Sequence, residues 1–195
     1  MSDSSLTIPV LLGSVRPERQ ALRAGQMVAE ALKAGGNEAI LVDPQTLRLP
    51  LLERTYSEYK QGEAPAGLDD LAALYRRADG FIIVSGEYNH GVPPALKNLL
   101  DYFLEEYFWR PSGIVCYSSG QFGGVRAAMQ LRMILAELGM PSIPTLLPIP
   151  RITHALDEAG RPQQDWIASA LADFLAEFTW YARAMKQARA GGTPY

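Results

Sequence analysis

The sequence has few of the residues on which several protein classes depend. Its single cysteine, Cys116, excludes an internal disulfide and leaves no cysteine cluster for zinc. Its two histidines, His90 and His154, lie far apart in the chain and lack the spacing of metal ligands, so we expect no metal site. This sparing use of cysteine is typical of a reducing compartment, and we expect a cytoplasmic protein.

The chain also lacks a charge excess and long hydrophobic runs. Its 18 Lys and Arg residues against 21 Asp and Glu give a net charge of −3, without the basic excess of a nucleic-acid binder. No apolar stretch approaches the ~20 residues of a membrane span, and the first residues show no basic segment followed by an apolar run. We therefore expect no nucleic acid or membrane as a partner, and no secretion.

What the chain does contain is an alternation of two apolar patterns. Continuous apolar runs predict buried strands, and segments with apolar residues at three- and four-residue spacing predict helices. The predicted strands are residues 7–12, 38–43, 80–85, 112–117 and 142–147, and the predicted helices are 21–34, 68–77, 94–106, 125–138 and 165–189. Nothing marks a second domain, so residues 1–195 are predicted to form one. The alternation predicts an α/β fold, a doubly wound five-stranded parallel sheet in the order 2-1-3-4-5 with helices on both faces.

Two segments interrupt this alternation. Residues 44–67 are longer than a usual connection of ~2 to 6 residues, which indicates a functional excursion or an interface. Residues 148–162 contain proline and glycine and are predicted to form a surface loop before the final helix.

The loop after the first predicted strand has the residue types of a phosphate site. Gly13 and Ser14 are followed by Arg16, Arg19 and Gln20, and then a helix begins. Backbone N–H groups at a helix start, a serine hydroxyl and arginines suit a phosphate dianion. The spacing fits neither a Walker loop nor a dinucleotide GxGxxG motif. The alternative is a simple glycine turn flanked by solvated arginines.

The loop after the third predicted strand is shaped at both ends. Gly86 and Gly91 permit unusual backbone conformations, and two prolines stiffen the entry into the next helix. Between them lie four polar or aromatic residues: Glu87, Tyr88, Asn89 and His90. Backbone groups held open in this way suit the edge of a flat heterocycle, although His90 is equally typical of an exposed loop.

The loop after the fourth predicted strand is rich in glycine. It reads Ser118-Ser119-Gly120-Gln121-Phe122-Gly123-Gly124, so backbone can approach a ligand closely. Phe122 is interpreted as a core anchor in preference to a cover over a ligand. A Cys-x5-Arg phosphatase cradle is excluded because position 122 is not arginine, and Cys116 is interpreted as a small buried residue. In the predicted strand order the three loops converge on one sheet edge.

Two features of the region after residue 94 are interpreted as structural. Lys97 and Asp101 have the spacing of a surface ion pair, and the adjacent Glu105 and Glu106 are interpreted as a solvated face. Aromatic residues are also concentrated here, which we interpret as a contact with a second subunit. These residues are Tyr102, Phe103, Tyr107, Phe108 and Trp109. We therefore expect a homodimer or homotetramer.

Together the motifs resemble those of the flavodoxin-like NADPH-dependent FMN reductases, a family that includes quinone, azo and chromate reductases. The resemblance covers about residues 7–151 and depends most on Glu87-Tyr88-Asn89 followed by Pro94-x-Leu96-Lys97-Asn98-x-x-Asp101. Gly13-Ser14-x-Arg16 and the loop at residues 118–124 support it. Two departures are a longer run after Arg16 and Gly86 in place of a proline.

The resemblance implies a bound FMN as cofactor. Its phosphate would lie at Ser14, Arg16, Arg19 and Gln20, with Arg23 as a further candidate. Residues 87–90 would line the flavin ring, and residues 118–123 would close its other side. No side chain need act as a catalytic acid or base, because the flavin carries the chemistry.

The resemblance also implies a ping-pong oxidoreductase that uses NADPH, or NADH, and a small acceptor such as free flavin, a quinone, an azo compound or a metal oxyanion. Arginines near the site tilt the choice toward NADPH. Two alternatives stay open. One is a flavodoxin-type electron carrier that does not oxidise nicotinamide, and the other is a flavin-free interaction module on the same scaffold.

Overall fold

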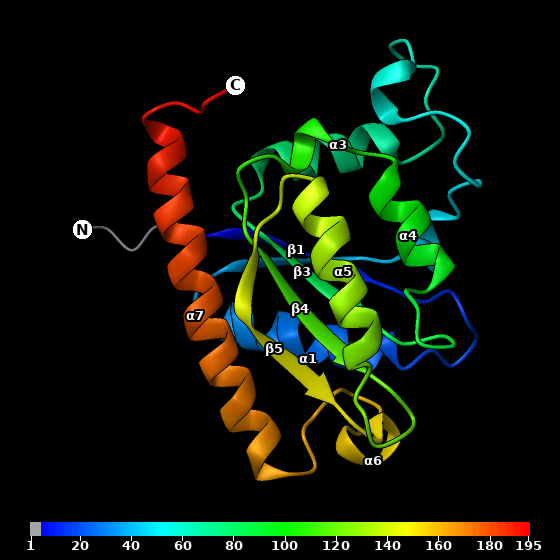
Figure 1. Cartoon of the computed structure of the whole chain (residues 1–195), viewed down its shortest axis with the longest axis vertical. Coiled ribbons are helices and arrows are strands. Elements are labelled where there is room, and N and C mark those ends of the chain that lie inside the picture. The colour runs from blue at the N-terminus through cyan, green and yellow to red at the C-terminus, as the bar shows by residue number, and fades with distance from the viewer. Residues whose placement is uncertain (1–4) are drawn as a thin grey trace.

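A computed structural model describes residues 5–195 and shows one twisted sheet between helices (Figure 1). The strands are β1 (Thr7–Leu12), β2 (Glu38–Val42), β3 (Phe81–Ser85), β4 (Ser112–Tyr117) and β5 (Ser142–Ile149). All four pairings are parallel, and the order is β2-β1-β3-β4-β5. The predicted fold class and strand order are confirmed. Strand β5 runs two residues past the predicted end, so Pro148 and Ile149 belong to the sheet.

The central strands are apolar because both of their faces are covered. All residues of β3 and β4 are buried. Along β1, Val10 and Leu12 point into one core and Leu11 into the other, as the two-residue period of a strand requires.

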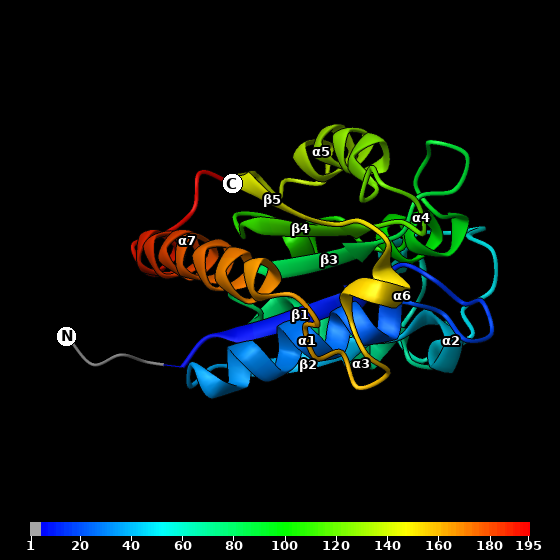
Figure 2. The same ribbon diagram turned by 90° about the horizontal axis from the view of Figure 1, so that it is seen from below.

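Helices cover the two faces of the sheet separately. α1 (Ala21–Ala34) and α7 (Asp165–Ala190) pack on one face. α3 (Leu68–Arg77), α4 (Pro94–Asp101) and α5 (Val125–Glu137) pack on the other. Figure 2 shows α5 on the opposite side of the sheet from α1 and α7. No helix within residues 5–195, the 26-residue α7 included, combines length and apolar character sufficiently to span a bilayer.

Short elements that the sequence pattern does not predict occupy the two long connections. Residues 44–67 contain α2 (Pro44–Leu47) and the 3-10 turn η1 (Tyr56–Glu58), and residues 148–162 contain α6 (Ile152–Ala155). The Asp43 carboxylate accepts a hydrogen bond from the Gln45 N–H at 3.0 Å and caps α2. Strand β2 therefore ends one residue earlier than predicted.

The predicted helix 94–106 is too long, because α4 ends at Asp101. Tyr102, Phe103 and Tyr107, which follow it or lie in the 3-10 turn η2 (Glu105–Tyr107), are at most 2% exposed. The rings of Phe103 and Tyr107 pack with each other and with Tyr75 and Phe81 in one cluster, at centroid distances of 5.0 to 6.3 Å. The Tyr102 hydroxyl donates to the Pro50 carbonyl at 3.0 Å. The interpretation of this aromatic group as a subunit contact is therefore wrong for these three side chains, which fill the core of their own chain.

The two structural interpretations of nearby charges have different outcomes. The Lys97 ammonium and the Asp101 carboxylate form the expected ion pair along α4. Glu106, in contrast, is buried and accepts a hydrogen bond from the Arg76 guanidinium at 2.7 Å. The prediction of a solvated face is wrong for Glu106, because η2 turns that side chain toward α3.

Candidate functional site

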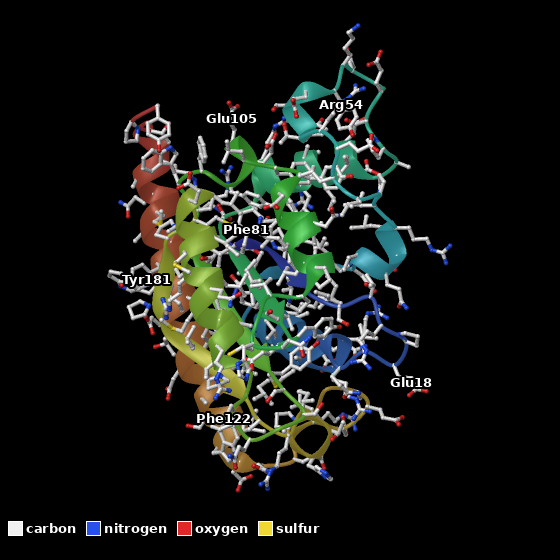
Figure 3. The ribbon with its side chains drawn as sticks, turned by 45° about the vertical axis from the view of Figure 1, so that its right-hand side comes forward. Glu18, Arg54, Phe81, Glu105, Phe122 and Tyr181 are labelled. Carbon is white, nitrogen blue, oxygen red and sulfur yellow. The ribbon has the colours of Figure 1, made fainter. Side chains whose placement is uncertain are left out.

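The three predicted loops meet at the carboxyl ends of β1, β3 and β4. They line one cavity of about 290 Å³, to which α6 also contributes. Its lining residues are Ser14, Arg16, Pro17, Glu18, Arg19, Gln20, Gly86, Glu87, Tyr88, Tyr117, Ser118, Ser119 and Thr153. Figure 3 labels Glu18 and Phe122, which both lie toward this end of the molecule, whereas Arg54 and Glu105 lie at the opposite end. The predicted convergence of the loops is therefore present.

The first loop passes close against β3. The Gly13 N–H donates to the Val84 carbonyl at 2.8 Å, and a Cβ on Gly13 would lie 2.8 Å from the same oxygen. The Ser14 side chain is buried, and its hydroxyl forms a 3.0 Å hydrogen bond with the Tyr88 hydroxyl. This bond joins the first and third loops across the cavity wall.

The arginines of the first loop and of the start of α1 differ in their hydrogen-bond partners. The Arg19 guanidinium bonds to the Asp43 carboxylate and to the Gln45 side chain. The Arg23 guanidinium donates to the Leu156 carbonyl at 3.2 Å. Arg16 is exposed, and within residues 5–195 its side chain has no partner. The free guanidinium of the cavity is therefore that of Arg16.

Gln20 precedes the first residue of α1. Its side-chain N–H donates to the Glu18 carbonyl at 3.0 Å, and its Oε1 is buried without a hydrogen-bond partner. The Gln20 side chain does not cap α1, and the helix begins directly after this cavity-lining residue. This end of the cavity offers both donors and a single unsatisfied acceptor.

The third loop contains a tight two-residue turn. The backbone N–H of Tyr88 donates to the carbonyl of Gly91 at 3.0 Å, and the reverse bond measures 2.9 Å. Asn89 and His90 have positive φ values of 50° and 66°, as both central residues of a type I′ β-turn require. Both side chains are exposed and lie outside the cavity lining, although the sequence placed them with Glu87 and Tyr88.

Glu87 connects this loop to α5. Its Oε2 accepts hydrogen bonds from the backbone N–H groups of Arg126 at 3.0 Å and Ala127 at 3.2 Å. The carboxylate thus caps the helix N-terminus and is compensated by its dipole. Glu87 fixes the position of the turn and is not an unpaired acid at the cavity.

The loop after β4 contributes Ser118 and Ser119 to the cavity. The Ser118 hydroxyl donates to the Gly120 carbonyl at 3.0 Å, which holds the loop in a bend. Gly123 has a φ of 63° and lies outside the lining, as does Gly120. Phe122 is 53% exposed beneath the Arg126 guanidinium, so the prediction that it anchors the core is wrong.

Several lining residues were missed by sequence reasoning. Tyr117 ends β4, and a Cβ on Gly86 would lie 3.0 Å from its ring, so the two form one wall. Burial raises the pKa of the Tyr117 hydroxyl, which stays protonated at neutral pH. Thr153 lies on α6, after β5. A contribution from this segment was predictable, because the parallel strand β5 ends at the same sheet edge as β1, β3 and β4.

Cys116 directly precedes the lining residues Tyr117 and Ser118, but its own side chain does not line the cavity. Its side chain packs in the core beneath α4 and α5, and burial raises the pKa of its thiol to about 12. The interpretation as a small buried residue is confirmed. Among residues 5–195, no group of three His, Cys, Asp or Glu side chains is placed to hold a metal ion.

Sequence comparisons connect this geometry to known proteins. The family model for NADPH-dependent FMN reductase matches residues 6–154. A quinone reductase of Escherichia coli K12 is 34% identical over 140 residues, covering 68% of this chain and 71% of that protein. An NAD(P)H-dependent FMN reductase of Schizosaccharomyces pombe is 35% identical over 111 residues, covering 57% of this chain and 49% of that protein.

Solved structures share the fold at lower identity. The flavoenzyme FerB of Paracoccus denitrificans, an NAD(P)H:(acceptor) oxidoreductase, superimposes with a TM-score of 0.70 at 19% identity, over 92% of this chain and 98% of that one. A flavodoxin of Pseudomonas aeruginosa gives 0.53 at 20% identity, over 86% and 98%. These likenesses establish a flavodoxin-like fold, and the match over residues 6–154 shows that the chain belongs to the NADPH-dependent FMN reductase family of oxidoreductases.

Proposed function

We propose that FMN binds at the carboxyl edge of the sheet, with its phosphate at Ser14, Arg16 and the first turn of α1. One observation carries this proposal, namely that three loops distant in sequence line a single cavity there. The donor set fits the group, because the Arg16 guanidinium has no partner within residues 5–195 and an uncapped helix start favours an anion. The buried, unpartnered Oε1 of Gln20 is an acceptor for a ribityl hydroxyl.

The ring is proposed to lie between residues 87–90 and residues 118–123. Within residues 5–195, the backbone N–H groups of Asn89 and Gly120 have no acceptor, so each remains a donor for a heterocycle edge. Preorganised donors of this kind also stabilise negative charge that develops on a bound group. Glu87 and the turn at Asn89 and His90 hold one of these donors in position without taking part in the chemistry.

When bound, FMN supplies the two-electron chemistry, accepting hydride from NAD(P)H and passing electrons to an acceptor. The chain's own residues orient the donor and acceptor and leave an approach open. Asn89, His90 and Phe122, in the loops that follow β3 and β4, are exposed. An open approach fits a ping-pong cycle with varied small acceptors, such as free flavin, quinones, azo compounds or metal oxyanions.

The experiment that tests this function is spectroscopic. The purified protein is saturated with FMN, freed of oxygen, and mixed with NADPH or NADH while the visible absorbance is followed. We expect the yellow colour to bleach and a quinone to restore it, with parallel double-reciprocal plots when both substrates are varied. A protein that takes up no FMN contradicts the proposal, and a yellow colour that persists with both nicotinamides identifies an electron carrier instead.

A homodimer or homotetramer is proposed as the assembled form. Its support now comes from the outer face of α5, where Met129 and Met133 lie one turn apart and are 56% and 70% exposed. Light scattering of the protein and of the M129K/M133K variant tests this, since the variant is expected to shift toward the monomer mass.

A further inference from the structure

Strand β2 is an outer strand of the sheet, and its outer edge is open. Within residues 5–195 it pairs with β1 alone. The Glu38 N–H donates to the Leu6 carbonyl at 2.8 Å, so the backbone of Glu38 faces β1. Backbone groups alternate in direction along a strand, and those of Ala39 and Leu41 therefore point away from the sheet. In the described part of the chain these outward N–H and C=O groups have no backbone partner.

The opposite edge of the sheet, formed by β5, is blocked. Pro144 and Pro148 lie within β5 and have no N–H to donate. The Arg132 guanidinium occupies further groups of this strand, because it donates to the Ile143 carbonyl at 3.1 Å and to the Pro144 carbonyl at 2.6 Å. Prolines and charged side chains are the means by which proteins prevent another strand from pairing with an edge.

Strand β2 lacks this protection. It reads Glu-Ala-Ile-Leu-Val, without proline, and the carboxylate of Glu38 is already paired with Arg77 at 2.7 Å. A cavity of about 280 Å³ lies beside the strand, between β2, α2 and α3. Its apolar lining includes Ile40 and Leu74, which are both half-buried. An open edge with an apolar groove beside it is suited to pairing with another strand.

The charges of α3 favour a second copy of this chain as the partner. The first turn of α3 carries Asp70, which is exposed and lies with Asp43 at the carboxyl end of β2. The last turn carries Arg77, which lies with Glu38 at the amino end of β2. A copy related by a two-fold axis across β2 has the reverse direction. Its basic α3 end therefore lies toward the acidic α3 end of the first copy.

We propose that β2 pairs with β2 of a second copy, antiparallel about a two-fold axis at Ile40, so that one sheet continues across both copies. In this register Ala39 lies opposite Leu41 of the partner subunit, and their outward N–H and C=O groups exchange hydrogen bonds. The Ile40 side chains of the two copies meet at the axis and cover the apolar groove. The inference goes beyond the proposed function, because it requires no ligand in the FMN cavity.

This contact is separate from the one proposed on the outer face of α5. Figure 2 shows α5 and β2 on opposite sides of the molecule. Both contacts can therefore form at once, and a homotetramer with two-fold symmetry needs two different self-complementary interfaces. The experiments use the M129K/M133K variant as the parent protein, so that the β2 contact is measured without the contact on α5.

The first test is disulfide cross-linking at the two-fold axis. Directly opposed residues at a non-hydrogen-bonded position of antiparallel strands have Cα atoms about 4.5 Å apart, within reach of a disulfide. Ile40→Cys is therefore expected to give a disulfide-linked dimer on mild oxidation, as a non-reducing gel reports. The native Cys116 is buried and is not expected to contribute.

Glu38→Cys is the matched control, because Glu38 is exposed on the same strand. In the proposed register it lies about 13 Å from its symmetry mate, too far for a disulfide. E38C is therefore expected to stay monomeric on the gel. Absence of the I40C disulfide, or equal cross-linking of E38C, would overturn the inference.

The second test weakens the contact without a new thiol. Ile40→Lys places like charges opposite each other at the axis and is expected to raise the dimer dissociation constant about tenfold, as sedimentation velocity over a concentration series measures. Pro144→Lys adds the same charge to the blocked β5 edge and is expected to leave the constant unchanged. Circular dichroism checks that both variants are folded. A constant that does not change in I40K, or rises equally in P144K, would contradict the pairing.

The same variants separate this inference from the proposed function. Ile40 lies outside the lining of the FMN cavity, so I40K is expected to bind FMN and to be bleached by NAD(P)H as its parent is. If the flavin is bleached but I40C gives no cross-link, the reductase function stands and the β2 contact fails. If I40C is cross-linked but no nicotinamide bleaches the flavin, the contact stands and the reductase function fails.

Discussion

The two edges of the sheet use charge in different ways. At the amino edge, the buried Asp79 carboxylate accepts hydrogen bonds from the Thr7 N–H at 3.0 Å, from Lys186 at 2.9 Å and from Arg189 at 3.2 Å. At the carboxyl edge, Arg19 is paired with Asp43, but the Arg16 and Arg151 side chains have no partner within residues 5–195. Paired charges stabilise the fold by satisfying buried polar groups, whereas unpaired guanidinium groups beside cavities are available to a ligand.

The difference extends to packing. The part of the molecule at the amino edge of the sheet contains the aromatic cluster of Tyr75, Phe81, Phe103 and Tyr107, whose rings are at most 2% exposed. The carboxyl edge instead contains glycines, exposed polar side chains and a turn with two positive φ values. Substitutions at the first edge are expected to change stability, and those at the second to change ligand affinity.

The largest expected effect is that of Phe81→Ala. Removing a fully buried ring from the aromatic cluster leaves a cavity and lowers the free energy of unfolding by about 3–5 kcal/mol. Urea unfolding measures this loss. The FMN affinity of the protein that remains folded is expected to stay within about twofold, and a large loss of affinity without a loss of stability would break the division between the two edges.

A smaller effect is expected for Tyr88→Phe, which removes the 3.0 Å hydrogen bond to Ser14. One neutral hydrogen bond contributes about 1 kcal/mol, so the free energy of unfolding is expected to fall by about that amount. Because the bond joins two walls of the proposed FMN cavity, FMN affinity is expected to fall by up to about fivefold as well. Flavin fluorescence measures the affinity. Tyr195→Phe is the control, because Tyr195 is exposed and distant from the cavity. The same loss in both variants would remove the role assigned to the Ser14–Tyr88 bond.

The smallest effect at neutral pH concerns Cys116. Because burial raises its pKa from 9.0 to about 12, the thiol is neutral in the folded protein at pH 8. Iodoacetamide is expected to label it only after unfolding, as mass spectrometry reports. The contribution of the neutral thiol to the free energy of unfolding is therefore complete below about pH 9 and is lost as the pH rises toward 12. Rapid labelling of the folded protein would place Cys116 at the open edge instead.

The layout of the sheet was predictable because its local signals agree. Runs such as Phe81 to Val84 are too apolar for a half-exposed strand, and helical spacing separates each run from the next. The end of α4 was not predictable, because Tyr102 and Phe103 fit the helical pattern and leave it only for distant partners, the Pro50 carbonyl for Tyr102 and the Tyr75 ring of α3 for Phe103. Tertiary packing decides that boundary.

The loops that form the candidate site were predictable from the sequence, but the partners of their individual side chains were not. Ser14, Arg16 and Ser118 line the cavity as their positions after strands suggest. The partners of Arg19 and Glu87 lie 24 and 39 residues away, so no local pattern shows that these charges are already occupied. A contact of Arg19 or of Glu87 with FMN stays a prediction.

The most direct test of the central claim compares two exposed arginines at opposite ends of the molecule. FMN is titrated into flavin-free wild-type protein, Arg16→Gln and Arg54→Gln, with flavin fluorescence as the readout; Arg54 is labelled in Figure 3. Loss of a charge-assisted phosphate contact is expected to weaken FMN binding by R16Q about 10- to 100-fold, with R54Q within about twofold of wild type. Equal affinities of R16Q and wild type would contradict the placement of the FMN phosphate at the carboxyl edge.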